Sequence, residues 1–499
     1  MAALLPPGSG PRLETRQEWP AAGPDRYDAI ALLLPAGAQP GPRLPTPGSW
    51  KALARRGTSD HGSIRATTLG SEGHCLGVMG YCRIGASTFE QLRVAGLVAQ
   101  KLFAERPQCR RIAIVVEAPQ AERAGLQEAL CSAVLAQAFA LPSEKKTVTK
   151  PPAGVAAIDV IGHCPLDLKR LTVTAAATNL VRHLTALPPN RLDAAGYRRV
   201  IAQLARRHDL RQRWYDEKRL EKLGAGAFLA VSRGNPRRDA GIMHLSWRPR
   251  GRRGADRPDV ALVGKGVLFD TGGVNLKTHR HMLDMHTDMS GSAVALAAIT
   301  ALAELKAPIA VDAWLAITEN AIGPAAYRPQ EIVRALDGTT IQVIHSDAEG
   351  RMILADTLAL AARSRPRLMV DYATLTGACV YSLTERMSGV FANDDALREA
   401  FVKAGRDSGE RLWPFPLPED YDSDIESPVA DVAQCAVDGK GDHILAARFL
   451  QRFLPKDQRW VHVDLSSATR RGGLAHVNTE ITGFGARFTL AALLDQAVR

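Results

Sequence analysis

The feature that most constrains the fold of this chain is a regular alternation of apolar runs and helical patterns along its second half. Four nearly continuous apolar runs predict strands, over residues 260–269, 309–317, 368–372 and 460–465. Helical patterns follow them, near residues 292–305, 351–362, 444–453 and 487–497. Strands that are apolar on both faces must be covered on both sides, which favours a largely parallel or mixed sheet between helices. The sequence therefore predicts a large α/β/α domain.

The first third of the chain shows a smaller alternation of the same kind. Strand-like runs over 29–34, 112–116 and 155–161 alternate with helical patterns over 89–105 and 122–138, which predicts a small N-terminal α/β domain. Two domains also suit a chain of 499 residues, which is long for one hydrophobic core. The segment before Pro188-Pro189 is helical in pattern, and prolines stop helices. We therefore expect a disordered Pro/Gly-rich tail (1–24), the small domain (25–168), a connecting helix (169–190) and the large domain (191–499).

Cysteine use and hydropathy bear on where the protein works. The seven cysteines are scattered and form no CxxC pair, which is typical of a reducing compartment rather than of a disulfide framework. The N-terminal segment lacks the basic region of a signal peptide, and no apolar run approaches the roughly 20 residues that a membrane helix needs. The sequence predicts a cytoplasmic protein without a membrane partner.

The net charge of +11 is concentrated in one loop-like stretch, and this suggests a nucleic-acid partner. Clustered arginines can bind phosphates. The stretch lacks interleaved aromatic residues and any helix-turn-helix signal, so a solvated surface loop is favoured and nucleic-acid binding stays an alternative, as a side activity. The arginines are Arg233, Arg237, Arg238, Arg248, Arg250, Arg252 and Arg253.

Charged residues follow two of the predicted strands, where functional groups of such sheets usually gather. Lys265 and Asp270 lie in the first apolar run, and burying them costs several kcal/mol unless partners or metals neutralise them. Converging carboxylates suit divalent cations such as Mn²⁺, Mg²⁺ and Zn²⁺, and two ions about 3.5–4 Å apart can share bridging carboxylates. A lysine can join such a site only as the neutral amine, whereas Lys277 could stay charged and hold a developing oxyanion.

Each of these groups also has a purely structural interpretation. The run from Ser346 to Glu349 matches a capping box at a helix N-terminus. Asp270-Thr-Gly-Gly is compatible with an ordinary turn, and Asp288 with a charge that the helix dipole favours. Each interpretation is plausible singly, but all of them together are much less so.

Taken together, these residues resemble the leucine aminopeptidase (cytosol aminopeptidase) family, whose hallmark is an NTDAEGR-type motif. The resemblance runs from about residue 173 to the C-terminus, with matching order and spacing. It rests on Gly264-Lys265-Gly, Asp270-Thr-Gly-Gly, Lys277, Asp288-Met and Asp347-Ala-Glu349-Gly-Arg351.

The resemblance implies a two-metal aminopeptidase that removes the N-terminal residue from short peptides with free N-termini. It implies that one metal ion, Mn²⁺ or Zn²⁺, binds to Lys265, Asp270, Asp288 and Glu349. The second and more exchangeable ion would bind to Asp270, Asp347 and Glu349. Lys277 would stabilise the oxyanion, and Arg351 would hold a bicarbonate ion that acts as base toward a metal-bridged water. A cytoplasmic homo-hexamer is also implied.

Two further positions match parts of the family's substrate site. Met285 corresponds to the pocket for the first side chain of the substrate, although a buried core methionine is equally plausible. Leu375 lies in a segment that contacts substrate through its backbone. The sequence departs from the family pattern at His345, Ser346 and Val380, and this leaves substrate preference open. Three histidines near the expected metals are interpreted as surface or substrate-loop residues: His279, His281 and His286.

Overall fold

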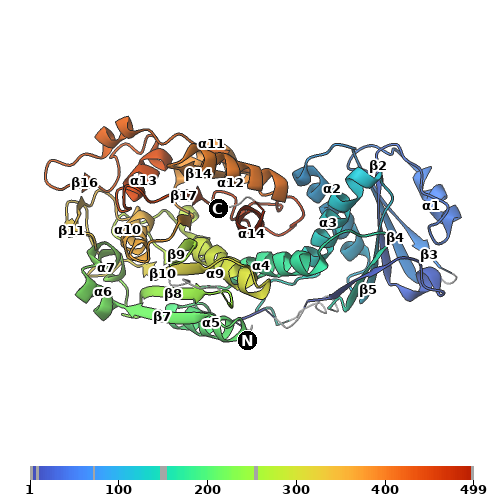
Figure 1. Ribbon diagram of the computed structural model, residues 1–499, viewed down its shortest axis with the longest axis horizontal. Helices are drawn as coiled ribbons and strands as arrows, with labels where there is room; N and C mark the ends of the chain where they lie inside the picture. Colours follow the sequence, from blue (N-terminus) through green and yellow to red (C-terminus); the bar gives the residue numbers. More distant parts are fainter. Residues whose placement is uncertain (1–3, 7–9, 71–72, 147–153, 252–256, 496–499) are drawn as a thin grey trace.

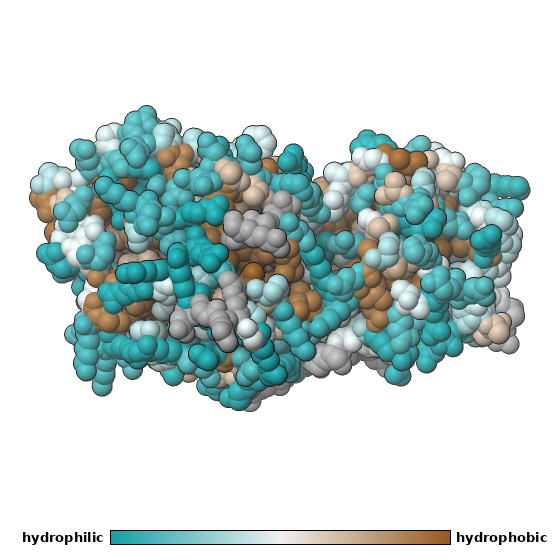
Figure 2. Space-filling model, viewed as in Figure 1, coloured by the Kyte–Doolittle hydropathy of each residue, from teal (hydrophilic) through white to brown (hydrophobic). Residues whose placement is uncertain are grey.

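The computed structural model describes residues 4–6, 10–70, 73–146, 154–251 and 257–495 and shows two lobes. Helix α4 (Leu168–Ala186) lies between the small N-terminal lobe and the larger C-terminal lobe (Figure 1). Hydrophilic residues dominate the face shown in Figure 2. Among the described residues, no helix is long and apolar enough to cross a membrane. The α/β class is confirmed, while the exact domain boundaries stay predictions.

The small lobe is built on a six-stranded sheet in the order β1-β6-β5-β2-β4-β3. All neighbouring strands are parallel except β3 and β4. Helices α1, α2 and α3 complete the lobe, and α2 packs against α3. The bounds are β1 Arg12–Arg16, β2 Ala29–Pro35, α1 Pro47–Ala54, β3 Ile64–Leu69, β4 Cys75–Cys82, α2 Thr88–Glu105, β5 Arg111–Val116, α3 Gln120–Gln137 and β6 Ala157–Ile161.

The expectation of a disordered tail over residues 1–24 is wrong for residues 12–16. These residues form the edge strand β1, which pairs in parallel with β6 from Arg12 opposite Ala157 onward. Leu13 packs against the lobe's core, and Arg16 donates to the buried Asp159 at 2.5 Å. An edge strand with one large apolar residue gives a weak sequence signal, and the Pro/Gly-rich composition around it concealed the strand.

The large lobe contains an eight-stranded mixed sheet in the order β15-β14-β17-β13-β9-β10-β8-β7. The four strands expected from the apolar runs are its parallel centre, β17-β13-β9-β10. Antiparallel neighbours flank them, with β8 beside β10 and β14 beside β17. The bounds are β7 Arg211–Asp216, β8 Gly241–Trp247, β9 Val260–Asp270, β10 Val311–Asn320, β13 Leu368–Ala373, β14 Ser388–Ala392, β15 Leu412–Pro414 and β17 Trp460–Asp464.

Helices cover both faces of this sheet, as predicted. Two apolar clusters lie on the opposite faces, one formed with α4, α5, α9, α12 and α14 and the other with α7, α10 and α13. Helix α9 packs very closely, since a Cβ on Gly291 would lie 2.1 Å from the carbonyl oxygen of Tyr372. The bounds are α5 Ala194–Arg207, α7 Gly226–Ser232, α9 Ser290–Glu304, α10 Glu349–Ala362, α12 Asp395–Ser408, α13 Asp442–Gln451 and α14 Ala486–Leu494.

Candidate metal centre

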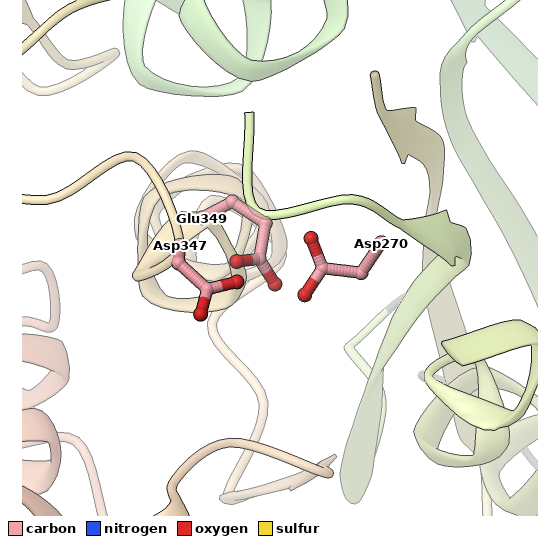
Figure 3. Close-up of side chains that lie close together, drawn as sticks. All are labelled: Asp270, Asp347 and Glu349. Atoms are coloured by element: carbon pink, nitrogen blue, oxygen red, sulfur yellow. The ribbon is translucent and has the colours of Figure 1, made fainter. Parts of the chain in front are cut away.

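Three carboxylates meet at the carboxyl end of strand β9. Asp270 is the last residue of β9, Glu349 is the first residue of α10, and Asp347 lies in the loop before α10. One oxygen from each lies within 4.8 Å of the others. Figure 3 shows the three side chains pointing toward one another. The parallel sheet thus brings together residues that are more than 70 positions apart, as the sequence predicted for a strand-end site.

Lys265 joins a fourth carboxylate, Asp288, to this cluster. Its Nζ lies 2.9 Å from Asp288 Oδ1 and 2.9 Å from Glu349 Oε1, and it donates to the carbonyl oxygen of Thr374 at 2.8 Å. The hydroxyl of Thr374 donates to Asp288 Oδ1 at 2.6 Å. Asp288 lies just before α9, so the close packing of α9 on the sheet fixes its position.

Lys277 contacts the opposite side of the cluster. Its Nζ lies 2.8 Å from Asp270 Oδ2 and 2.5 Å from Asp347 Oδ1. The side chain of Lys277 is 14% exposed, against 4% for Lys265. Lys277 therefore lies on the side that a small molecule can reach.

The pKa values of the cluster reflect crowding of negative charge in a buried place. Burial and the neighbouring carboxylates raise the pKa of Asp288 to about 8 and that of Asp347 to about 7. Burial would also raise the pKa of Asp270, but Lys277 and Lys265 outweigh it, so that the pKa is lowered. For Lys265, burial favours the neutral amine, yet Asp288 and Glu349 prevail and raise the pKa. The neutral Lys265 expected from sequence therefore requires the positive charge of a cation to displace its proton.

The donor set fits divalent cations. Four carboxylates face two lysines, so the fully ionised cluster has an excess of two negative charges. Asp288 Oδ2 and Glu349 Oε2 are buried and have no hydrogen-bond partner. Buried carboxylate oxygens without donors are costly, and oxygen-rich sites of this kind suit Mn²⁺ or Zn²⁺. A cation would balance the excess negative charge and give the two unpaired oxygens a partner.

Residues that the sequence interpretation missed hold Asp270 in place. Asn320 Nδ2 donates to Asp270 Oδ1 at 2.8 Å and to the carbonyl oxygen of Ser346 at 3.0 Å. The backbone N–H of Gly272 donates to Asp270 Oδ1 at 2.8 Å. Asn320 ends strand β10 directly opposite Asp270. Its place at the end of a neighbouring strand is the signal that could have revealed it.

The capping-box interpretation of Ser346 is wrong. Helix α10 has Ala348 at its N-cap and no side-chain cap. The Ser346 hydroxyl instead donates to the carbonyl oxygen of Gly272 at 2.6 Å and accepts from the backbone N–H of Asn275 at 2.8 Å. Ser346 therefore ties the loop that follows Asp270 at the end of β9 to the loop before α10, which carries Asp347.

Arg351 lies one residue beyond Glu349-Gly350 in the first turn of α10 and is fully buried. Its Nη2 donates to both carboxylate oxygens of Asp442, at 2.7 and 2.8 Å. Its Nη1 donates to the carbonyl oxygen of Gln434 at 3.1 Å. The side chain of Gln434 in turn contacts the backbone of His345 and Ala348. Neither Asp442 nor Gln434 was expected from sequence.

Comparison with known proteins decides the family. The catalytic domain of the cytosol aminopeptidase family matches residues 179–490, which is more than half of the chain. The chain belongs to the cytosol aminopeptidase family.

Relatives within the family extend this finding. A probable cytosol aminopeptidase of Chlorobaculum tepidum is 37% identical over 322 residues, which cover 64% of this chain and 63% of that relative. The chain thus matches just under two thirds of the relative's length. A solved structure titled bottromycin maturation enzyme BotP in complex with Mn has a TM-score of 0.80 at 30% identity and covers 93% of this chain and 98% of its own. A mutant of tomato leucine aminopeptidase shares the fold, with a TM-score of 0.84, 24% identity and 98% coverage of both chains.

The two substrate residues inferred from the cytosol aminopeptidase resemblance flank the Lys265–Asp288 side of the cluster. Met285 begins a short 3-10 helix (Met285–Thr287) directly before Asp288 and is partly exposed. Leu375 follows Thr374, is partly buried, and donates its backbone N–H to Asp464 at 3.1 Å. Val380 is also partly exposed, in the helix α11 (Gly377–Leu383).

The three histidines between Lys277 and Asp288 are not part of the carboxylate cluster. His279 and His281 are exposed, and His281 Nδ1 lies 3.2 Å from the hydroxyl of Thr278. His286 is partly buried, and burial lowers its pKa. None of the three histidines belongs to the group of side chains that lie close enough together to hold a metal ion, which consists of Asp270, Asp347 and Glu349.

Most of the arginines behind the nucleic-acid hypothesis pair with acidic residues of the protein itself. Arg237 contacts Asp193 at 2.6 Å, Arg238 contacts Glu217 at 2.8 Å, and Arg248 contacts Asp312 at 2.7 Å. Arg233 pairs with Glu331. Arg252 and Arg253 lie outside the described residues. These ion pairs reduce the positive charge that the stretch could offer to phosphates.

Proposed function

We propose that this chain is a two-metal aminopeptidase that removes the N-terminal residue from short peptides. The observation that carries this proposal is the buried carboxylate cluster with two lysines at the carboxyl end of β9, in which buried oxygens have no donor. Membership in the cytosol aminopeptidase family supports it, as does the manganese in the similar structure of BotP.

Two overlapping sets of residues would hold the metal ions. Asp270 and Glu349 would serve both ions, with Lys265 and Asp288 completing one set and Asp347 the other. The ions, Mn²⁺ or Zn²⁺, would supply Lewis acidity toward the scissile carbonyl and lower the pKa of the attacking water. Lys265 would give up its proton on binding, because only a free amine can be a ligand.

Lys277 is the group that would stabilise the developing oxyanion. It approaches the cluster from its accessible side and touches both Asp270 and Asp347. Burial alone would lower the pKa of Lys277, but Asp270, Glu349 and Asp347 outweigh it and raise the pKa, so Lys277 keeps its positive charge at neutral pH. A fixed ammonium next to the reacting carbonyl stabilises negative charge more in the transition state than in the substrate.

Other parts of the proposal concern substrate and assembly. Met285 would line the subsite for the N-terminal side chain, and the segment around Leu375 would contact the substrate through its backbone. The free amino group of the substrate would bind at the metal side of the cluster. Arg351 would hold the anionic group that acts as base toward the attacking water. A cytoplasmic homo-hexamer with access for short peptides completes the proposal. Nucleic-acid binding is the alternative, and the ion-paired arginines do not favour it.

A panel of unblocked and N-acetylated dipeptides tests this function. We expect release of the first residue only from unblocked peptides, loss of that release after chelation, and recovery when Mn²⁺ or Zn²⁺ is restored. Salt-sensitive DNA binding by a folded, metal-loaded protein that cleaves none of these peptides would contradict the proposal and favour the alternative.

A further inference from the structure

The contact between Arg351 and Asp442 places a carboxylate of the protein where an external anion is expected. The guanidinium of Arg351 is 2% exposed, and its Nη2 contacts both oxygens of Asp442 at 2.7 and 2.8 Å. A buried guanidinium requires an anionic or strongly polar partner. Asp442 fulfils this requirement within the chain.

The fold holds Asp442 in this position. Asp442 is the first residue of α13, and it follows Gly441, whose φ of +61° turns the chain into the helix. The positive end of the dipole of α13 favours a carboxylate at that place. Arg351 comes from the first turn of α10, 91 residues earlier. The two helix N-termini thus converge on one ion pair.

The remaining donors of Arg351 leave little opportunity for a second anion. Nη1 donates to the carbonyl oxygen of Gln434 at 3.1 Å. Nε is buried and has no partner, but it lies on the edge of the guanidinium that it shares with Nη2, next to the Asp442 carboxylate. An incoming bicarbonate would therefore have to displace Asp442.

Asp442 is partly open to solvent, and its partner Arg351 lies two residues after Glu349 in α10. The side chain of Asp442 is 24% exposed, so water can reach it. Arg351 also donates to the carbonyl oxygen of Gln434, and the Gln434 side chain contacts the backbone of His345 and Ala348, on either side of Asp347. The ion pair of Arg351 and Asp442 is therefore anchored to the segment that carries Asp347 and Glu349.

We infer that Asp442 is the built-in anion of Arg351 and that this enzyme works without bicarbonate. The inference rests on the proposed peptidase function. The attacking water transfers one proton to the Asp442 carboxylate as its oxygen bonds to the scissile carbonyl carbon. That proton then passes to the leaving nitrogen when the C–N bond breaks, and Asp442 returns to its ionised form.

The test compares the metal-loaded full-length protein in carbon-dioxide-free buffer with and without added bicarbonate. The rate of the wild-type protein is expected to stay unchanged. Asp442→Gly should lower kcat by about 10²-fold or more, the typical contribution of a general base, and bicarbonate should restore part of the rate. Asp442→Asn should lose the same activity without rescue, because the amide still fills the space. Asp438→Asn, at an exposed aspartate of the same loop that pairs with Lys440, is the matched control.

Binding of bicarbonate gives a second readout that does not depend on activity. We expect bicarbonate to raise the Tm of Asp442→Gly but not that of the wild type. A rise in the Tm or the rate of the wild-type protein would overturn the inference, and so would full activity of Asp442→Gly. Absence of cleavage with any metal would instead sink the proposed function, while the Tm measurement would still decide whether Asp442 fills the anion site.

Discussion

Two groups of charged side chains are buried against the same eight-stranded sheet, and they differ in how completely their carboxylates are satisfied. In the first group, Asp371 Oδ1 contacts His462 Nδ1 at 2.6 Å, and Asp371 Oδ2 accepts from Trp460 Nε1 at 2.7 Å. All three residues are fully buried. Burial alone would lower the pKa of His462, but Asp371 outweighs it and raises the pKa. The negative charge of Asp371 is therefore balanced by the positive charge of His462.

In the second group, the metal cluster, negative charge exceeds positive charge. Four carboxylates share Lys265 and Lys277, and oxygens of Asp288 and Glu349 have no donor. Burying an excess of like charge weakens a fold unless a ligand repays the cost. The comparison teaches that unbalanced negative charge, rather than burial of charge as such, distinguishes the candidate functional site.

The largest effect is expected from removing Asp371, whose two carboxylate oxygens both have partners. Asp371→Ala leaves the donors of Trp460 and His462 buried without an acceptor, so the free energy of unfolding should fall by about 3–5 kcal/mol. Urea unfolding measures this change. Asp395→Ala, at a position that is 83% exposed, serves as the control. Peptidase activity per folded molecule should persist. A loss of activity in the folded variant would contradict a purely structural role for the Asp371 group.

The next largest effect concerns the accessible lysine of the metal cluster. Lys277→Met removes the charge that stabilises the oxyanion, so kcat should fall by about 10²–10³-fold, as for other oxyanion donors. Bound metal, measured by elemental analysis, should stay close to the wild-type amount. Lys101→Met, which removes an exposed lysine of the small lobe, should leave kcat unchanged. An equal loss in both variants would argue against a specific role for Lys277.

A smaller effect, and one of opposite sign, is expected for stability when a carboxylate of the metal cluster is neutralised. Asp347→Asn relieves repulsion from Asp270 and Glu349, so the protein stripped of metal should gain on the order of 1 kcal/mol in free energy of unfolding. The same variant should bind Mn²⁺ more weakly. Thermal unfolding with and without metal measures both changes. Destabilisation of the stripped protein by Asp347→Asn would show that the cluster is satisfied without cations.

The smallest effect is the pH dependence of the stripped protein. The pKa values of Asp347 and Asp288 are raised to about 7 and about 8, above the ordinary value for an aspartate. The native state therefore binds more protons than the unfolded state between about pH 4 and 8, and the contribution of these groups to stability falls as pH rises through this window. The Tm of the stripped protein should decline from pH 5 to 8 more steeply than that of Asp347→Asn. Parallel pH profiles would contradict the raised pKa values.

The two groups also differ in how far the sequence could predict them. The strands and the carboxylates of the metal cluster carry local signals, namely apolar runs that end in acidic and glycine residues. Thr374 and Asp442 carry none, because each acquires its role through pairing with a distant segment. Thr374 bonds to Asp288 86 residues away, and Asp442 to Arg351 91 residues away. Such partners become visible only when the register of the sheet and the packing of the helices are known.

The most direct test of the central claim is a titration of the chelator-stripped protein with Mn²⁺ that follows bound metal, released protons and cleavage of an unblocked dipeptide. We expect two ions to bind per chain and cleavage to rise with the amount of bound metal. Protons should be released as Lys265 and the carboxylates with raised pKa values become ligands. Glu349→Gln should bind less metal and stay inactive. Full cleavage in the stripped protein, or active protein that binds no metal, would contradict the assignment of the carboxylate cluster as a catalytic metal centre.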